Sequence, residues 1–229
     1  MSCKLHHPFT GIVAGPTGSG KSKWVLRLID HANEIIEPPP TRIWYCYGEF
    51  QPAFNSYPWV HFHEGLPERS DRVFDGLEST LIILDDLMSD SNQLVANIFT
   101  KIYHYRNSIL NLTQNLFDKN KYARTISLNA HYLVLFKNPR DASQFATLAR
   151  QMYPSSWKFA IEAYKDATRA PYGYLLIDLK PEQDERCRLR TNIFPGGKSI
   201  RLRHSRQIKE RVRDTSQSFP HTTCQRTNR

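Results

Sequence analysis

The sequence predicts a single α/β domain with a mainly parallel sheet and helices on both faces. As far as residue 180, apolar runs alternate with segments in which apolar residues recur at helical spacing. This alternation is typical of strand–helix–strand units, whose strands lie parallel. The chain has 229 residues, of which 40% are hydrophobic, and this is enough for one full core but short for two.

In the first half of the chain, the predicted strands are separated by one patterned helix and one irregular segment. Apolar residues from Trp24 to Ala32 fall on one face of a helix, and "EPPP" (37–40) ends it because proline supplies no N–H donor. Residues 48–79 are rich in proline, glycine and aromatic residues and are expected to be irregular. The predicted strands are "FTGIVA" (9–14), "TRIWYCY" (41–47) and "STLIILDDL" (79–87), with a short one at "WVHF" (59–62).

The second half continues the alternation up to a last strand. Apolar residues at helical spacing predict an amphipathic helix over 92–106, which Asp90 or Ser91 is placed to cap. Two further helices have apolar residues from Phe145 to Met152 and from Trp157 to Tyr164, and the strands are "SILNLT" (108–113), "HYLVLF" (131–136) and "YGYLLIDL" (172–179). The domain is therefore expected to span residues 5–182. Residues 183–229 lack the apolar residues that offset ordering entropy, and are expected to form a basic, disordered tail.

The net charge of +9 is concentrated in this tail. Residues 1–180 contain 19 Lys and Arg and 17 Asp and Glu, a net charge of +2. Residues 181–229 contain 12 and 5, a net charge of +7. A basic tail on a nearly neutral domain favours an acidic partner such as nucleic acid. A solvated tail with no specific partner is the alternative.

Composition also bears on the compartment. No run of about 18 apolar residues exists, so neither a membrane-spanning segment nor a membrane partner is expected. Residues 1–11 lack the apolar centre of a secretory signal. The four cysteines form no C-x-x-C pair, which argues against a zinc site or a disulfide framework and favours a reducing, intracellular setting.

One glycine-rich stretch has the pattern of a phosphate-binding loop. "GPTGSGKS" (15–22) matches G-x-x-x-x-G-K-[ST], the P-loop or Walker A motif, and it lies between an apolar strand and a patterned helix. The glycines let backbone N–H groups point at phosphate oxygens, and the helix presents its positive end to the same anion. Lys21 is expected to reach the β- and γ-phosphates, and Ser22 to join a Mg²⁺ shell. The predicted ATP-binding residues are Gly15, Pro16, Thr17, Gly18, Ser19, Gly20, Lys21, Ser22 and Lys23.

The strand at 79–87 ends in two acidic residues and has the pattern of a Walker B strand. It delivers Asp85 and Asp86 to the carboxyl edge of the sheet, where doubly wound folds bind their ligands. Asp85 is predicted to hold Mg²⁺, directly or through water, and Asp86 to orient and polarise the attacking water. Two adjacent carboxylates repel each other unless a cation lies nearby. The alternative is that both residues only cap the next helix.

The strand at 108–113 is followed by the neutral amides of Gln114 and Asn115. This strand should lie next to the P-loop strand, so that its polar end faces the γ-phosphate. A neutral amide there can hydrogen-bond both the attacking water and the phosphate without adding charge. Gln114 is the predicted sensor of the γ-phosphate, with Asn115 second. The alternative is that Gln114 only caps the strand.

Taken in order, "GPTGSGKS", "LIILDDLM", "HYRNSILNLTQNLF" and "SLNAHYLVLFKNPRD" resemble the FtsK–HerA group of P-loop ATPases. The similarity is greatest to the DNA-packaging ATPases of large double-stranded DNA viruses, such as the poxvirus packaging ATPase. It extends to adenovirus-like viruses and to the Maverick/Polinton transposons. It covers roughly residues 9–180, and its most specific feature is an Arg just before a strand that ends in Thr-Gln. The resemblance implies a RecA-like P-loop NTPase fold and a multimeric motor that translocates DNA.

The resemblance also implies roles for single residues. Arg106 matches the Arg before the sensor strand, which implies an arginine finger inserted into a neighbouring subunit's site. A helix C-terminal cation is the alternative for Arg106. At position 86, Asp replaces the more widespread Glu, and its shorter reach leaves the assignment of the base open. The residues on Walker A, Walker B and sensor positions are Lys21, Ser22, Asp85, Asp86 and Gln114, and the arginines that compete with Arg106 are Arg124, Arg140 and Arg150.

The function predicted is ATP-driven translocation of double-stranded DNA, for viral or transposon genome packaging. By family analogy the protein would work as a homo-oligomeric ring of five or six subunits, with a capsid or portal protein as a further partner. A viral protein of this kind acts inside the host cell, in nucleus or cytoplasm. The alternative is a nucleotide switch, or a nucleotide or nucleoside kinase, without DNA translocation. A kinase would need a lid with several arginines, whereas the basic residues here lie in a tail.

Overall fold

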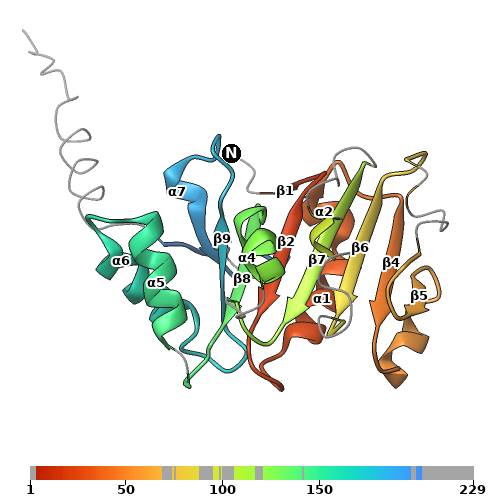
Figure 1. The fold of residues 1–229 in the computed structure, drawn as a ribbon, viewed down its shortest axis with the longest axis horizontal. Coiled ribbons are helices and arrows are strands. Elements are labelled where there is room, and N and C mark those ends of the chain that lie inside the picture. The colour runs from red at the N-terminus through yellow and green to blue at the C-terminus, as the bar shows by residue number, and fades with distance from the viewer. Residues whose placement is uncertain are drawn as a thin grey trace, which may run out of the picture.

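The computed structural model describes residues 4–68, 74, 76–87, 95–97, 99, 106–116, 121–140, 142–196 and 200–202 (Figure 1). Its strands are β1 (Leu5–His6), β2 (Thr10–Ala14), β3 (Ile36–Glu37), β4 (Arg42–Tyr47), β5 (His61–Glu64), β6 (Thr80–Asp85), β7 (Asn107–Thr113), β8 (Tyr132–Phe136), β9 (Tyr174–Asp178), β10 (Leu189–Thr191) and β11 (Ile200–Arg201). Its helices are α1 (Lys21–Asp30), α2 (Ala32–Ile35), α4 (Lys121–Leu128), α5 (Ala142–Met152), α6 (Trp157–Ala167) and α7 (Glu185–Arg188), and Pro52–Ser56 forms a 3-10 turn.

The described strands form a nine-stranded sheet in the order β11-β10-β9-β8-β2-β7-β6-β4-β5, and β1 and β3 pair separately. From β8 to β5 all neighbours are parallel, which confirms the mainly parallel sheet. The margin from β9 to β11 is antiparallel, which the alternation did not predict. Phe136, the last residue of β8, pairs with Tyr174, the first of β9, because α5 and α6 together return the chain to the edge that it left.

The fold continues past residue 182, where the sequence predicted the domain to end. α7, β10 and β11 all follow that point, and β10 pairs with β9 inside the main sheet. The Arg190 guanidinium lies 3.0 Å from the Asp178 carboxylate, and both side chains are buried. The predicted end of the domain at residue 182 is therefore too early. From the sequence alone, an arginine that is buried beside a carboxylate cannot be told apart from an arginine in a solvated tail. Residues 197–199 and 203–229 of the predicted tail lie outside the described residues.

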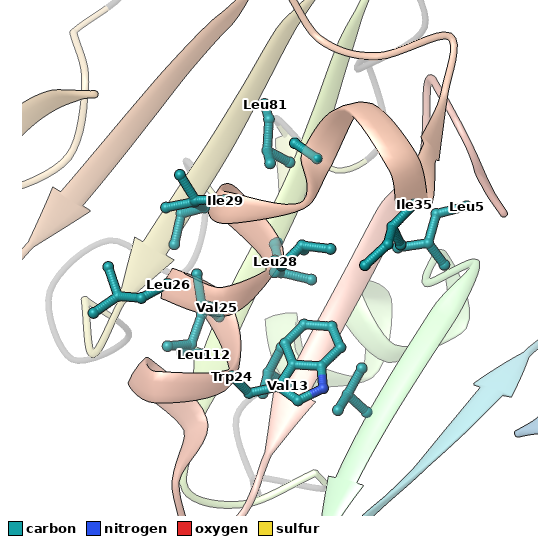
Figure 2. Packing of buried hydrophobic residues seen from close by; sticks show 14 of the residues in the cluster. Leu5, Val13, Trp24, Val25, Leu26, Leu28, Ile29, Ile35, Leu81 and Leu112 are labelled. Carbon is teal, nitrogen blue, oxygen red and sulfur yellow. The ribbon is translucent and has the colours of Figure 1, made fainter. Parts of the chain in front are cut away.

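Both faces of the sheet are buried, which confirms that helices cover both faces. On one face, Val25 and Leu28 of α1 pack towards Val13, Leu81 and Leu112 of the strands (Figure 2). The opposite face carries α5 and α6, whose buried residues are Phe145, Leu148, Ala149, Ala160, Ala163 and Ala167. Because the strands are covered on both sides, their sequences are continuous apolar runs. The pairing of β6 with β7 and of β7 with β2 places the carboxyl ends of these three strands at one edge of the sheet.

One predicted helix lies mostly outside the described residues, and one helix of the structure, α4, was not predicted. The helix predicted over 92–106 falls mostly outside the described residues, although 95–97 and 99 are helical. The segment between the predicted strands at 108–113 and 131–136 contains α4, which was missed because few of its residues, such as Ala123 and Ile126, are buried. Within the described residues, no helix has the length and apolar character needed to cross a membrane.

Candidate nucleotide-binding site

A cavity of about 590 Å³ opens at the carboxyl edge of the parallel strands. Its volume falls within the range of about 300–1,000 Å³ that is usual for small-molecule sites. The walls come from the P-loop and the start of α1, the ends of β4, β6 and β7, and the turn before β9. The cavity brings together the predicted site residues Thr17, Gly18, Gly20, Lys21, Ser22, Lys23, Asp85, Asp86 and Gln114. Gly15, Pro16 and Ser19 do not line it.

The loop between β2 and α1 leaves the first turn of a helix open to the cavity. Gly20 precedes α1 with a φ of 102°, a left-handed value that favours glycine, and no side chain caps the helix there. A Cβ on Gly15 would lie 2.7 Å from the Cβ of Phe136, so the loop passes close to β8. The Gly15 N–H donates to the Thr113 carbonyl at 3.2 Å and ties the loop to the end of β7. The uncapped N–H groups at the start of α1 are suited to binding an anion.

Lys21 places a positive charge between this loop and two carboxylates. Its ammonium group donates to the carbonyl oxygens of Gly15 at 2.7 Å and of Pro16 at 3.2 Å. Burial lowers the pKa of Lys21 from its ordinary value, and the negative charges of Asp85 and Asp86 partly oppose this shift. The two carbonyl oxygens are neutral acceptors for the Lys21 ammonium group. A bound polyphosphate would give this group an anionic partner.

Asp85 is held by two hydroxyl groups that donate to the same carboxylate oxygen. Alternation along β6 places Leu81, Ile83 and Asp85 on the face covered by α1, so the carboxylate points towards Ser22. The Ser22 hydroxyl donates to Asp85 Oδ2 at 3.2 Å, and the Tyr45 hydroxyl donates to the same atom at 2.6 Å. Burial, followed by the charge of Asp85, raises the pKa of Tyr45 far above its usual range, so Tyr45 stays a proton donor.

The donor set at Ser22 and Asp85 fits Mg²⁺. A hydroxyl and a carboxylate are hard oxygen donors, and their oxygens lie 3.2 Å apart at the phosphate loop. Proteins usually hold Mg²⁺ with one or two carboxylates together with substrate phosphates and water. The assignment of Ser22 and Asp85 as metal ligands stays a prediction that this geometry permits.

Asp86 and Gln114 reach the cavity from the ends of neighbouring strands. β6 pairs with β7, and β7 pairs with β2, so the sensor strand lies next to the P-loop strand as predicted. Asp86 has a φ of 56°, a left-handed conformation that ends the strand abruptly. Gln114 lines the cavity and Asn115 does not, which favours Gln114 between the two predicted sensors.

Arg106 is not brought to this cavity. It immediately precedes β7, whereas Gln114 follows it, so the two residues lie at opposite ends of the strand. Eight residue steps along a strand amount to about 26 Å, far beyond the reach of an arginine side chain. Arg106 is exposed and has a φ of 50°, and His7 Nε2 lies 3.0 Å from its carbonyl oxygen. A role in its own subunit's site is thereby excluded, and the predicted role in a neighbour's site stays a prediction.

Sequence reasoning missed Tyr45, which lies beside the cavity, and several residues that line it, among them Glu49 and Tyr172. Tyr45 orients Asp85, Glu49 contributes a further carboxylate beyond the end of β4, and Tyr172 lines the cavity from the turn before β9. None of the three belongs to a nucleotide-binding motif. The only signal for Tyr45 was its place on a strand that neighbours the Walker B strand, at an alternate position that faces α1.

Among known proteins, no family model and no curated protein matches the chain. The genome packaging NTPase B204 of Sulfolobus turreted icosahedral virus 2, in complex with AMPPCP, aligns with a TM-score of 0.51 and 11% identity, over 80% of this chain and 96% of that chain. A KaiC-like protein from Pyrococcus horikoshii aligns with a TM-score of 0.42 and 10% identity, over 81% and 85%. The similarity to B204 shows a shared fold, a mixed α/β sheet with helices that is consistent with a RecA-like P-loop NTPase.

We expect the two aspartates to separate binding from hydrolysis. Asp85→Asn should lose Mg²⁺-dependent binding of an ATP analogue, because the charge beside Ser22 is removed. Asp86→Asn should still bind but hydrolyse ATP about 10²–10⁴-fold more slowly, the usual contribution of a general base. Equilibrium binding with and without Mg²⁺, and steady-state turnover, measure the two effects. Identical behaviour of the two variants would contradict this division. Normal turnover of Asp86→Asn would make Glu49 the candidate base.

We expect Tyr45→Phe to weaken the response to Mg²⁺ without abolishing binding. The variant removes the 2.6 Å hydrogen bond to Asp85 and leaves the buried ring in place. Loss of a partner that orients a metal ligand typically costs about 10- to 100-fold in metal affinity. A Mg²⁺ titration of analogue binding measures this effect. Tyr57→Phe is the matched control, because Tyr57 donates to the exposed Asp30 at 3.4 Å. An unchanged Mg²⁺ midpoint for Tyr45→Phe would show that Tyr45 does not orient Asp85.

Proposed function

We propose that this chain hydrolyses MgATP and uses the energy to move double-stranded DNA in viral or transposon genome packaging. The observation that carries the proposal is the meeting of Lys21, Ser22, Asp85, Asp86 and Gln114 in one cavity. Phosphoryl transfer to water needs donors for the phosphates, oxygen ligands for Mg²⁺ and a group that orients the water, and this set contains all three. When bound, Mg²⁺ would neutralise charge on the β- and γ-phosphates.

In this proposal each residue acts on a different part of the reaction. Lys21 and the N–H groups at the start of α1 hold the phosphate oxygens. Asp86 accepts a proton from the attacking water, and Gln114 hydrogen-bonds that water and the γ-phosphate. The strand that carries Gln114 is tied to the P-loop through the bond from the Gly15 N–H to the Thr113 carbonyl. This bond would pass a shift of the P-loop to the end of β7, next to Gln114.

Two observations support packaging as the use of this activity. The four motifs, taken in order, resemble those of the DNA-packaging ATPases, and the fold resembles that of the genome packaging NTPase B204. A fold alone hosts many functions, so the motif order carries the finer part of the proposal. Residues 203–229 contain seven Lys and Arg against two Asp and Glu, a charge suited to contact with DNA phosphates. A capsid or portal partner and a host-cell location belong to the same proposal.

The composition of the cavity favours a ring of subunits. Among the described residues that line it, none is an arginine. Phosphoryl transfer of this type commonly uses an arginine finger to stabilise the transition state. A neighbouring subunit would supply that group, which gives assembly a direct role in turnover. The same observation counts against a nucleoside kinase, whose lid would bring several arginines to the phosphates.

Turnover with different activators tests the proposal. ATP hydrolysis by the full-length chain is measured alone, with duplex DNA, and with a mixture of nucleosides and nucleoside monophosphates. The proposal predicts stimulation by duplex DNA only, and the stimulation should fall as salt displaces the protein from DNA phosphates. Stimulation by a small acceptor, with its phosphorylation, would establish a kinase. Hydrolysis that responds to neither would favour a nucleotide switch.

A further inference from the structure

Tyr172 is an aromatic residue in the cavity that the phosphate chemistry does not use. Tyr172 is 64% exposed although it lines the cavity beside Gly20 and Lys23. A Cβ built on Gly20 would lie 3.0 Å from Cδ1 of the Tyr172 ring, so the ring lies against the last glycine of the P-loop. The Lys23 ammonium lies 5.8 Å from the ring centroid, within cation–π range. The ring is therefore placed at the P-loop while most of its surface stays open.

The backbone at Tyr172 adopts a conformation that tyrosine rarely tolerates. The Gly173 N–H donates to the Ala170 carbonyl at 3.0 Å and closes a four-residue turn with Pro171 and Tyr172 at its centre. Tyr172 has a φ of 60°. Proline followed by a positive φ is the arrangement of a type II turn, whose third position normally holds glycine. A tyrosine in this conformation is strained, and strained residues of this kind cluster at binding and catalytic sites.

The order of the strands shows which end of a nucleotide would meet this ring. The P-loop strand β2 lies between β7 and β8, with β6 beyond β7 on one side and β9 beyond β8 on the other (Figure 1). Asp85 and Asp86 at the end of β6 mark the Mg²⁺ and water side of the cavity. Tyr172 precedes β9, on the opposite side of the P-loop. A triphosphate whose γ-phosphate faces the aspartates would extend its nucleoside away from them, towards Tyr172.

We propose that the Tyr172 ring stacks on the base of the bound nucleoside triphosphate. An exposed aromatic face offers stacking to any base, because every base has a π-face, and it does not by itself select adenine over guanine. The proposal rests on the proposed function of the same cavity as a nucleotide site. It adds that affinity depends on the base as well as on the phosphates, and that Tyr172 is the residue responsible.

Two substitutions separate the ring from the backbone. Tyr172→Gly removes the ring and relieves the positive φ, so the turn is preserved. Tyr172→Phe keeps the ring and removes only the hydroxyl. Each variant is titrated with Mg²⁺-AMPPCP and with Mg²⁺-tripolyphosphate, which has the phosphates but no base. Trp59→Ala is the matched control, because Trp59 is a 61% exposed aromatic residue that does not line the cavity.

Tyr172→Gly should bind AMPPCP about tenfold or more weakly, the loss expected for one stacked base, and should bind tripolyphosphate as the unmodified chain does. Tyr172→Phe and Trp59→Ala should bind both ligands normally. Unchanged AMPPCP binding by Tyr172→Gly would overturn the stacking role and leave the nucleotide site intact. Equal weakening for both ligands would also overturn it, because the residue would then shape the P-loop. Failure of the unmodified chain to bind either ligand would instead contradict the proposed function.

Discussion

Lys21→Ala is expected to lower ATP hydrolysis by at least about 10²–10³-fold, the loss usual for one donor aimed at the transition-state charge. ATP binding should also weaken, because the β- and γ-phosphates lose their main side-chain partner. In the structure, the Lys21 ammonium already faces two loop carbonyls and lies within the field of Asp85 and Asp86. Steady-state hydrolysis with duplex DNA, together with equilibrium binding of an ATP analogue, measures both effects.

Lys165→Ala is the matched control for this experiment. Lys165 is an exposed residue of α6 and does not line the cavity, so its removal should leave hydrolysis unchanged. Full DNA-stimulated turnover by Lys21→Ala would show that residues 15–22 do not form a catalytic phosphate loop. Equal losses in both lysine variants would point to a general effect of charge rather than to the P-loop.

Arg106→Ala is expected to abolish most turnover through a neighbouring subunit, because an arginine finger contributes about 10³–10⁵ in rate. Asp86→Asn subunits keep Arg106 but cannot activate water, whereas Arg106→Ala subunits keep an intact cavity. Each variant alone should be nearly inactive. Mixed rings would place an intact Arg106 beside an intact cavity, and part of the activity should return. The measurement is ATP turnover of the mixture against protein concentration, with recovery only where subunits assemble.

The position of Arg106 makes this mixing experiment decisive. Arg106 lies at the amino end of β7, and the cavity lies at the carboxyl end, so action within one subunit is ruled out by the strand between them. Mixtures that co-assemble and stay inactive would show that Arg106 is only an exposed cation at the sheet edge. The next candidates would then be Arg124, Arg140 and Arg150. Arg150 is the weakest of these, because its guanidinium lies 4.7 Å from the Trp157 ring centroid and is engaged there.

The parallel strands were predictable because strands that are buried on both faces have continuous apolar sequences. β2, β6, β7 and β8 lie within a residue or two of their predicted positions. β10 was missed because Arg190 interrupts the apolar pattern, and its burial depends on Asp178, a partner that is remote in sequence. The antiparallel direction of β9 was missed because it depends on two helices, α5 and α6, acting as one return connection.

In the site too, residues that belong to a sequence motif were predicted, and residues that only strand pairing brings to the site were not. Lys21, Ser22, Asp85, Asp86 and Gln114 were predictable because each belongs to a motif whose strand ends at the same edge of the sheet. Tyr45 and Tyr172 were not predictable from such motifs. Tyr45 reaches Asp85 only because β4 pairs with β6, and Tyr172 reaches the P-loop only because β9 runs antiparallel and begins at the edge of the cavity. The pairing of strands that are distant in sequence places both residues. A single sequence does not show which strands pair.

Movement along DNA is the central claim, and displacement of a triplex-forming strand from duplex DNA tests it most directly. A labelled third strand is bound at one end of a duplex, and its release is followed after the protein and MgATP are added. The claim predicts release with ATP, no release with AMPPCP, and no release by the Asp86→Asn variant, which still binds nucleotide. Hydrolysis of ATP on bound duplex with the third strand left in place would contradict the claim that this ATPase is a DNA motor.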